Sequence, residues 1–292
     1  MTLIELFEIY LRKRLKTCSR HTIRLYKHSI KAFSTTLGKT AEVADLTDDN
    51  LEDHMHQIVR SGLSIASANK DYAQLSAIWR FAHRNGYTTV WPNVKPLHEP
   101  EKVPLGWLNH EVDQLLNTID RLDYKISGAP ARLWWRVLLS ILLDTGERIG
   151  AIRQITRANV HGDYIVVPAA IRKRQTREKL YKLSPRTAED LKTLLALHRY
   201  DLVFPWDRSE TYIYYRYTAI LKDAGLASCG KSKFHRIRRT VASAVANQGG
   251  NATTAMDHAN ARTTMRYLDP RIVGGTSTAT LVHDWLESKR VK

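Results

Sequence analysis

The stretch WPNVKPLHEPEKVP, residues 91–104, decides how this chain is divided. It holds four prolines in fourteen residues and shows no helical or strand period, a composition that is typical of a semi-rigid linker between domains. Working outward from it, we expect a smaller domain over residues 1–91, a linker over residues 92–104 and a larger domain over residues 105–292.

The residues before the linker predict a small all-helical domain. Apolar side chains recur there at three- and four-residue steps, and capping residues bound each run. Ser19 and Gly38 bound one of these runs, and Ser64 or Ser67 opens the last of them. The expected helices cover residues 2–15, 19–38, 47–60 and 64–85.

The residues after the linker predict helices around a short strand pair. Asn109 caps a helix through Ile119, and the apolar segment RLWWRVLLSILLDTG, residues 132–146, is a buried helix. Helices resume at Ser184. The fold class is mainly α with a small β-sheet, an all-helical N-terminal domain being followed by a mixed α+β domain. Basic residues 172–176 form the turn of the expected hairpin, whose strands are DYIVVPAA (residues 163–170) and REKLYKL (residues 177–183).

The charge balance points to an anionic polymer as a partner. The 292 residues include 45 Lys and Arg against 29 Asp and Glu, a formal net charge of +16. Residues 12–39 hold nine basic side chains and no acidic one. Such a run is as typical of a solvated helix face as of a nucleic-acid contact.

Several classes of protein are disfavoured. The longest apolar run, residues 133–143, contains Arg136 and Ser140 and is shorter than the ~20 residues that a membrane span needs. The N-terminus has its basic residues after its apolar ones, the reverse of a secretory signal, so we expect a cytoplasmic protein. Cys18 and Cys229 lie far apart, which favours structural thiols over a disulfide or a zinc site.

Four stretches of the larger domain carry residues suited to chemistry. Each has an ordinary explanation when it is taken alone: a surface arginine, a solvated hairpin tip, a chance His–Arg spacing and an amphipathic core tyrosine. His235 and Arg238 are three residues apart, so a helix would present both on one face, toward a single anion. The stretches are TGERIGAI (145–152), the basic residues 172–179, FHRIRRT (234–240) and MDHANARTTMRYLDP (256–270).

Together and in this order, the four stretches resemble the active site of the tyrosine recombinases, also called the phage integrase family. TGERIG resembles the family's first-arginine box, and HRIRRT matches its His-x-x-Arg box. DHANARTTMRYLDP resembles its second-histidine and nucleophile box, with the same nine-residue step. The resemblance implies a helical core-binding domain of the SAM-like type, a linker and a catalytic domain that form a C-shaped clamp around DNA. The matched residues are Arg148, Lys173, His235, Arg238, His258 and Tyr267.

The chemistry of a phosphodiester explains why these residue types are needed. The five-coordinate transition state concentrates negative charge on the nonbridging oxygens, and two permanently charged guanidiniums, Arg148 and Arg238, can bind them with His258 as a further donor. A phenol has a pKa near ~10, so attack by Tyr267 requires a proton acceptor, for which His235 is our candidate. The resemblance implies a 3′-phosphotyrosyl link and a hairpin lysine, Lys173, as general acid toward the 5′-oxygen.

Three positions depart from the family pattern. Alignment of the second strand places the family lysine at Arg174 or Gln175, and Lys179 inside the strand is the alternative general acid. Ala151 stands where the family often has an acidic residue, which removes a possible orienting partner for an arginine. Asp257 stands where glycine usually precedes the second histidine, and its charge could raise the pKa of a neighbouring histidine.

The resemblance also implies partners. It implies a homotetramer on double-stranded DNA that exchanges strands through a Holliday junction with no metal, cofactor or ATP. The tail TATLVHDWLESKRVK, residues 278–292, fits a helix that packs into a neighbouring subunit or docks on its own domain. The expected DNA contacts are electrostatic and are made by Arg12, Lys13, Arg14, Lys16, Arg20, Arg24, Lys27, Arg172, Arg174 and Arg177.

Two other functions fit the same residues less well. A non-catalytic architectural protein would bind DNA without forming a covalent adduct, and the intact six-residue set argues against it. A relaxase of supercoils like the type IB topoisomerases would share the chemistry but act as a monomer. The sequence leaves open phage integration, transposon movement and replicon resolution.

Overall fold

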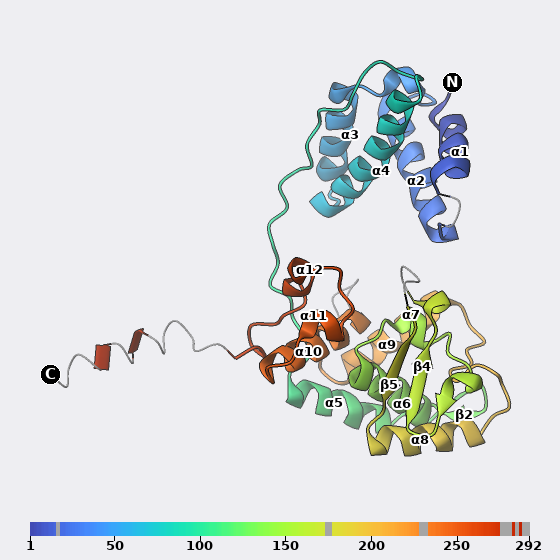
Figure 1. Cartoon of the computed structure of the whole chain (residues 1–292), viewed down its shortest axis with the longest axis vertical. Coiled ribbons are helices and arrows are strands. Elements are labelled where there is room, and N and C mark those ends of the chain that lie inside the picture. Colours follow the sequence, from blue (N-terminus) through green and yellow to red (C-terminus); the bar gives the residue numbers. More distant parts are fainter. Residues whose placement is uncertain (16–17, 173–176, 228–232, 275–281, 284–285, 288–292) are drawn as a thin grey trace. The chain divides into compact units, whose positions relative to one another are not determined.

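The structure is a computed structural model that describes residues 1–15, 18–172, 177–227, 233–274, 282–283 and 286–287. The chain divides into two compact units, Met1–Glu101 and Lys102–Lys292 (Figure 1). No helix in the described ranges combines the length and the apolar character that a membrane crossing requires.

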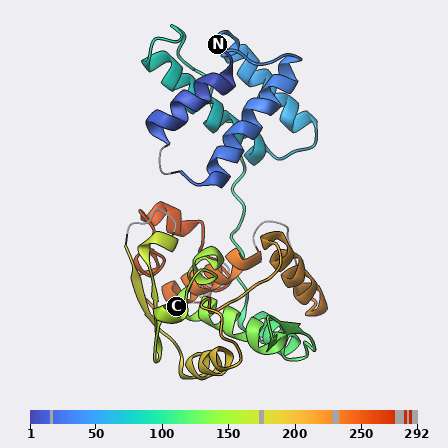
Figure 2. The ribbon, with the colours of Figure 1, turned by 90° about the vertical axis from the view of Figure 1, so that its right-hand side faces the viewer.

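The first unit is helical, as the sequence predicts. Ser19, Thr47 and Ser64 each cap a helix with their side-chain oxygen, because each accepts a backbone N–H three residues on. Gly38 ends the second helix with a φ of 68°, a left-handed conformation that glycine adopts without strain. Figure 2 shows these helices from a second side. They are α1 (Leu3–Arg14), α2 (Arg20–Leu37), α3 (Asp48–Arg60) and α4 (Ile65–Arg84), with the 3-10 turn η1 (Val43–Asp45) between α2 and α3.

A buried polar network joins three helices of the first unit. Asp71 on α4 is only 3% exposed, and its carboxylate accepts from the Ser29 hydroxyl at 2.7 Å and lies 3.4 Å from His54 Nε2. Burial alone would raise the pKa of Asp71, but hydrogen bonds from His54, Ser29 and Lys70 outweigh it and hold that pKa below its ordinary value. The ionised carboxylate therefore stabilises the packing of α2 and α3 on α4.

We expect Asp71→Ala to destabilise the first unit by about 2 kcal/mol at neutral pH, because buried hydrogen-bond donors lose their acceptor. Amide hydrogen exchange of α4 in the full chain should then be about 30-fold faster. Because the pKa is lowered on folding, the contribution is present above the ordinary carboxyl pKa and is lost as the pH falls through the lowered value. The exposed Asp53→Ala serves as the control, and equal exchange in both variants would contradict the assignment.

Part of the predicted linker packs on the first unit. The Tyr72 hydroxyl donates to the carbonyl of Val94, and the Asn69 side chain both donates to and accepts from the backbone of Leu97. Val94 is buried in the core of the first unit. The first unit therefore continues beyond the expected end at residue 91, because its α4 supplies polar groups that satisfy the backbone of the proline-rich segment.

The second unit surrounds one buried helix with helices and a small sheet. The predicted strand pairing is confirmed: β4 pairs antiparallel with β5, with Val167 opposite Lys179, and β3 pairs with the other edge of β4. The first strand ends at Val167 instead of residue 170, because the 3-10 turn η3 (Ala169–Ile171) follows it, and residues 173–176 of the predicted turn lie outside the described residues. Figure 1 shows β4 and β5 beside α6. The helices and strands of the second unit include α5 (Asn109–Asp120), α6 (Ala131–Thr145), α7 (Ile149–Ile152), β3 (Val160–His161), β4 (Tyr164–Val167), β5 (Lys179–Lys182), α8 (Pro185–Ala196), α9 (Glu210–Asp223), α10 (Lys233–Asn247), α11 (Ala252–Ala255) and α12 (Ala261–Met265).

The buried helix α6 carries the core and ends at the functional site. Trp134 and Trp135 are fully buried, and α6 contacts α5, α8 and α10. Gly146 ends α6 with a φ of 62°, and a Cβ there would lie 2.6 Å from the end of Met256. The turn therefore favours glycine for its backbone conformation, and a larger residue would also displace the end of the Met256 side chain. One expectation is corrected: Asn109 is the first residue of α5, and Leu108 is its N-cap.

Candidate active site

The predicted chemical residues of the second unit come from three places in the fold. Arg148 is the N-cap of α7, directly after the Gly146 turn. His235 and Arg238 lie one turn apart on α10. His258 follows α11, and Tyr267 follows α12. The packing of α10 against α6 and α11 brings these segments together, although Arg148 and Tyr267 are more than a hundred residues apart in sequence.

The ring of Tyr267 lies among three of the predicted residues of its own chain. Its centroid is 4.6 Å from that of His258 and 5.9 Å from that of His235. The Cζ atom of Arg238 lies 5.8 Å from the same ring. Ser243 on α10 holds the backbone, since its hydroxyl donates to the Tyr267 carbonyl at 3.3 Å. The phenol is therefore placed beside cationic and imidazole groups within one chain.

Arg238 ties two turns of the site together. Its side chain is buried, and its two terminal nitrogens donate to the carbonyls of Gly146 and Met256 at 2.5 Å. One of these nitrogens also lies 3.3 Å from Nε2 of His258. Burial and the nearby charge of Arg148 lower the pKa of Arg238. Because the charges of the two guanidiniums repel each other, the binding of an anion near both of them is favourable.

His258 is held as a neutral imidazole. Burial, followed by the charges of Arg238 and Arg148, lowers its pKa to about 4. The raising effect predicted for Asp257 is present, but burial and the two arginine charges outweigh it, so the net shift of the His258 pKa is downward. Because arginine only donates, Nε2 of His258 accepts from Arg238, and Nδ1 donates to the hydroxyl of Thr264 at 3.0 Å.

The lowered pKa of His258 makes the folded state sensitive to acid. Between the ordinary histidine value and about 4, the unfolded chain binds a proton that the folded chain does not, so stability falls as the pH is lowered through this range. We expect His258→Asn to show a smaller drop in melting temperature over that window than the unchanged chain. His161→Asn, an exposed histidine, is the control. An identical pH dependence in all three proteins would contradict the assignment.

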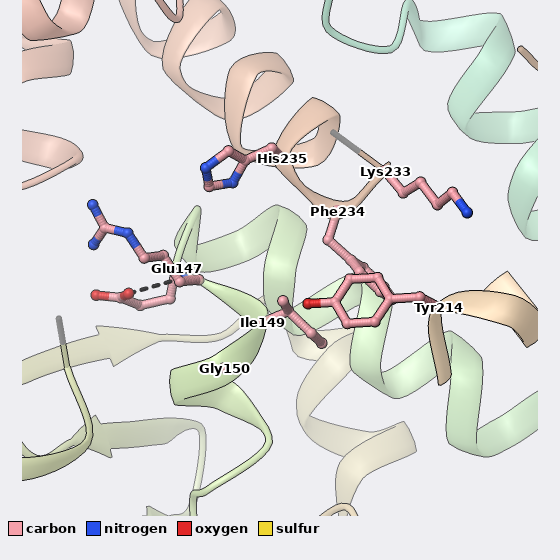
Figure 3. Close-up of a pocket in the computed structure, with 8 residues that line it drawn as sticks. Glu147, Ile149, Gly150, Tyr214, Lys233, Phe234 and His235 are labelled. Carbon is pink, nitrogen blue, oxygen red and sulfur yellow. Dashed lines mark hydrogen bonds between the residues drawn. The ribbon is translucent and has the colours of Figure 1, made fainter. Parts of the chain in front are cut away.

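A pocket of about 430 Å³ opens beside this cluster. Arg148 and His235 line it, so two predicted residues from different motifs face one space. Figure 3 shows His235 on α10 on one side of this pocket, with Glu147 on the α6–α7 turn and Tyr214 on α9. No sequence motif marks Tyr214, Lys233 or Glu147 individually, although all three line this pocket. Glu147 directly precedes Arg148 and Lys233 lies two residues before His235, whereas Tyr214 lies on α9, the helix that precedes α10.

Of the two lysine candidates, the structure describes Lys179, while Lys173 and Arg174 lie outside the described residues. Lys179 is on β5, and its ammonium donates to the carbonyl of Ala255 on α11 at 2.5 Å. Burial and the charge of Arg172 lower the pKa of Lys179, which makes it a better proton donor near neutral pH.

Arg172 does not present its guanidinium to solvent. It is 5% exposed and donates through Nε to Glu147 at 2.7 Å, while Nη1 donates to the carbonyl of Arg177 and lies 3.2 Å from Asp257. Its donors are engaged inside the protein, and a contact of Arg172 with DNA stays a prediction. Arg177 is exposed and pairs with Asp257.

The basic side chains predicted in the first unit lie on two helices. Arg12, Lys13 and Arg14 occupy the last turn of α1 and are exposed. Lys27 is exposed and pairs with Glu8 at 2.9 Å. Their role in DNA binding stays a prediction. Lys16 lies outside the described residues, and Arg20 and Arg24 are exposed on α2.

Comparisons with known proteins place this geometry in a family. Residues 107–272 match the phage integrase family, and residues 4–86 match the N-terminal SAM-like domain of phage integrase, so the chain belongs to the phage integrase family. No curated protein matches it in sequence.

Solved integrase structures share the fold. A lambda integrase dimer bound to a COC′ core site aligns with a TM-score of 0.72 and 18% identity, over 93% of this chain and 96% of that one. A lambda integrase tetramer bound to a Holliday junction aligns with a TM-score of 0.73 and 18% identity, over 93% and 78%. The integrase of transposon Tn1549 in complex with a circular intermediate DNA gives 0.75 and 13% identity, over 98% and 99%. At these identities the likeness is one of fold.

Proposed function

We propose that this protein is a site-specific DNA recombinase that cleaves and rejoins DNA through a 3′-phosphotyrosyl link to Tyr267. The observation that carries the proposal is the position of the Tyr267 ring, which lies among His258, His235 and Arg238 of the same chain. A phenol in such surroundings is suited to attack a phosphodiester, because charge that builds up on phosphorus oxygens meets fixed donors.

Phosphate binding is assigned to Arg148, Arg238 and His258. Arg238 enters the site already oriented by two backbone carbonyls, so little reorganisation is needed when a phosphate arrives. A bound phosphate also favours protonation of His258, since a nearby anion raises the pKa of an imidazole. The repulsion between the arginines is then relieved by the substrate, and this relief is greatest for the more highly charged transition state.

Proton transfer needs one acceptor and one donor. His235, whose ring faces Tyr267, takes the phenol proton as the Tyr267 oxygen forms its bond to phosphorus. The bond from phosphorus to the 5′-oxygen breaks, and a hairpin lysine supplies the proton to that oxygen. Lys173 is the residue indicated by the resemblance, and the contact of Lys179 with α11 supports the alternative.

The phosphotyrosyl link conserves the energy of the broken bond. A 5′-hydroxyl of another duplex can therefore reverse the attack, which gives strand exchange through a Holliday junction without a metal or ATP. The lambda integrase tetramer on a Holliday junction supports a tetramer of this chain on double-stranded DNA. The predicted tail helix falls on residues 278–292, most of which lie outside the described residues, so its exchange between subunits stays a proposal.

The first unit is assigned to DNA binding. Its exposed basic residues on α1 and α2 supply the electrostatic part of the affinity, which should weaken as salt is raised. In the second unit the described candidates are Arg177, which is exposed, and Arg172, which is buried.

Trapping with nicked DNA tests this function. Short duplexes that tile the DNA flanking the gene, each nicked near its centre, lose the cleaved fragment and retain the covalent adduct. We expect an adduct that survives detergent on a few duplexes, and a four-subunit complex on the joined site. Binding without any adduct would favour the architectural protein, and relaxation of supercoils by a single bound copy would favour the topoisomerase-like function.

A further inference from the structure

A chain of alternating charges joins three segments of the second unit: the turn before Arg148, the hairpin and the turn that carries His258. Glu147 of the α6–α7 turn pairs with Arg172 at 2.6 Å, and Arg172 lies 3.2 Å from Asp257. Asp257 also pairs with Arg177. Arg172 and Arg177 flank the hairpin turn, while Asp257 directly precedes His258. One continuous ionic network therefore holds the arginine turn, the hairpin and the histidine turn together.

Much of this network is buried, which makes its geometry specific. The side chains of Glu147 and Arg172 are 1% and 4% exposed. Burial would raise the pKa of Glu147, but the backbone N–H of Arg148 and the charge of Arg172 outweigh it and lower that pKa. Removing charges from water is costly, so a pair of this kind needs well-placed partners, and each partner here is on a different segment of the site.

The backbone at Asp257 adds a second observation. Its φ is 53°, in the left-handed region where glycine is unstrained and most side chains are not. Glycine at this position would adopt the conformation more easily. Aspartate adopts this conformation more readily than most side chains, and here its carboxylate is directed to Arg172 and Arg177.

The ionic network also contacts β5, the strand that carries Lys179. Glu147 accepts the N–H of Arg148 at 2.9 Å and the hydroxyl of Tyr181 at 3.1 Å. Tyr181 lies on β5 two residues from Lys179, whose ammonium is 5.0 Å from the Tyr181 ring. Lys179 donates to Ala255, two residues before Asp257. The Lys179 end of β5 is thus tied to α11, and Tyr181 ties the same strand to the α6–α7 turn.

We propose that Glu147, Arg172 and Asp257 are positioning residues that hold Lys179 beside the phosphate site, so that Lys179 delivers the proton to the departing 5′-oxygen. The inference rests on the proposed function. In this step the Tyr267 oxygen bonds to phosphorus, the bond from phosphorus to the 5′-oxygen breaks, and a proton passes from the Lys179 ammonium to that oxygen. Glu147 and Asp257 supply the carboxylates of this network. The position at which the family often has an acidic residue is Ala151 in this chain.

A substrate whose leaving group needs no proton tests this assignment. A site found by adduct trapping is made with its normal scissile linkage and with sulfur in place of the 5′-oxygen. A thiol is far more acidic than an alcohol, so the sulfur departs without a general acid. The variants in the full chain are Asp257→Asn, Asp257→Gly and Lys179→Ala, with Glu178→Gln as the control for an exposed carboxylate on the same hairpin.

We expect the three variants to cleave the normal linkage at least about tenfold more slowly than the unchanged chain, since general acid catalysis contributes 10²- to 10⁴-fold. On the sulfur linkage the cleavage rates of the three variants should lie within about threefold of the rate of the unchanged chain. Asp257→Gly suits the left-handed backbone, and its melting temperature, measured beside its rate, separates a loss of proton transfer from a folding defect. Glu178→Gln should match the unchanged chain on both linkages.

Two results would overturn the inference and leave the proposed function standing. One is normal cleavage of the oxygen linkage by either Asp257 variant or by Lys179→Ala. The other is equal slowing of cleavage on both linkages. The second result would assign the network to phosphate or nucleophile placement. Absence of any adduct from the unchanged chain on either linkage would overturn the proposed function, and the inference with it.

Discussion

Replacement of Tyr267 by phenylalanine should abolish the covalent protein–DNA adduct and leave DNA affinity unchanged. The substitution removes only the hydroxyl, and the ring keeps its place beside His258 and His235. Without a nucleophilic oxygen no phosphotyrosyl bond can form, and we expect the cleavage rate to fall on the order of 10⁴-fold or more. Single-turnover cleavage of a nicked duplex, resolved in denaturing gels, measures this rate.

The matched control is Tyr215→Phe, a phenol on α9 that is 64% exposed. It should form the adduct at the rate of the unchanged chain. An adduct that persists in Tyr267→Phe would assign the nucleophile to another residue.

Replacement of Arg238 by lysine should slow cleavage about 10²- to 10³-fold, although the positive charge is retained. The guanidinium makes planar, diverging contacts with the carbonyls of Gly146 and Met256 and with His258. A single ammonium cannot make these contacts and also present a fork to phosphate, so transition-state donors are lost. The measurement is the single-turnover rate at saturating protein, which separates the chemical step from DNA binding.

Because Arg238 is buried, the melting temperature of the variant must be measured beside its rate. Arg239→Lys, the neighbouring residue on α10, controls for a general change of charge on this helix. A rate for Arg238→Lys within about threefold of the unchanged chain would remove Arg238 from the phosphate site.

The sequence predicts helix starts and strand pairing where interactions between residues close in sequence determine them. Capping oxygens at Ser19, Thr47 and Ser64 mark the helix starts because each satisfies a backbone N–H only a few residues away. The hairpin followed from alternating and β-branched residues. The spacing of His235 and Arg238 also sufficed, since helical periodicity alone puts both on one face of α10.

Other features depend on neighbours that are distant in sequence. Arg172 and Arg177 look alike as basic hairpin residues, yet Arg172 is buried because Glu147 lies opposite it. The sign of the pKa shift at His258 also required the fold, since the charges of Arg238 and Arg148 and the burial of the ring outweigh the adjacent Asp257. No local pattern reports such distances.

The amino-acid sequence by itself determined the helices, the hairpin, the positive charge and the identity of the groups suited to phosphodiester chemistry, because these depend on residue type and on spacing within a few turns. The tertiary structure alone decided which of these groups meet. Packing of α10 against α6 and α11 places Tyr267 beside His235, Arg238 and His258, and the burial that results sets which charges stay in water and which are paired inside the protein.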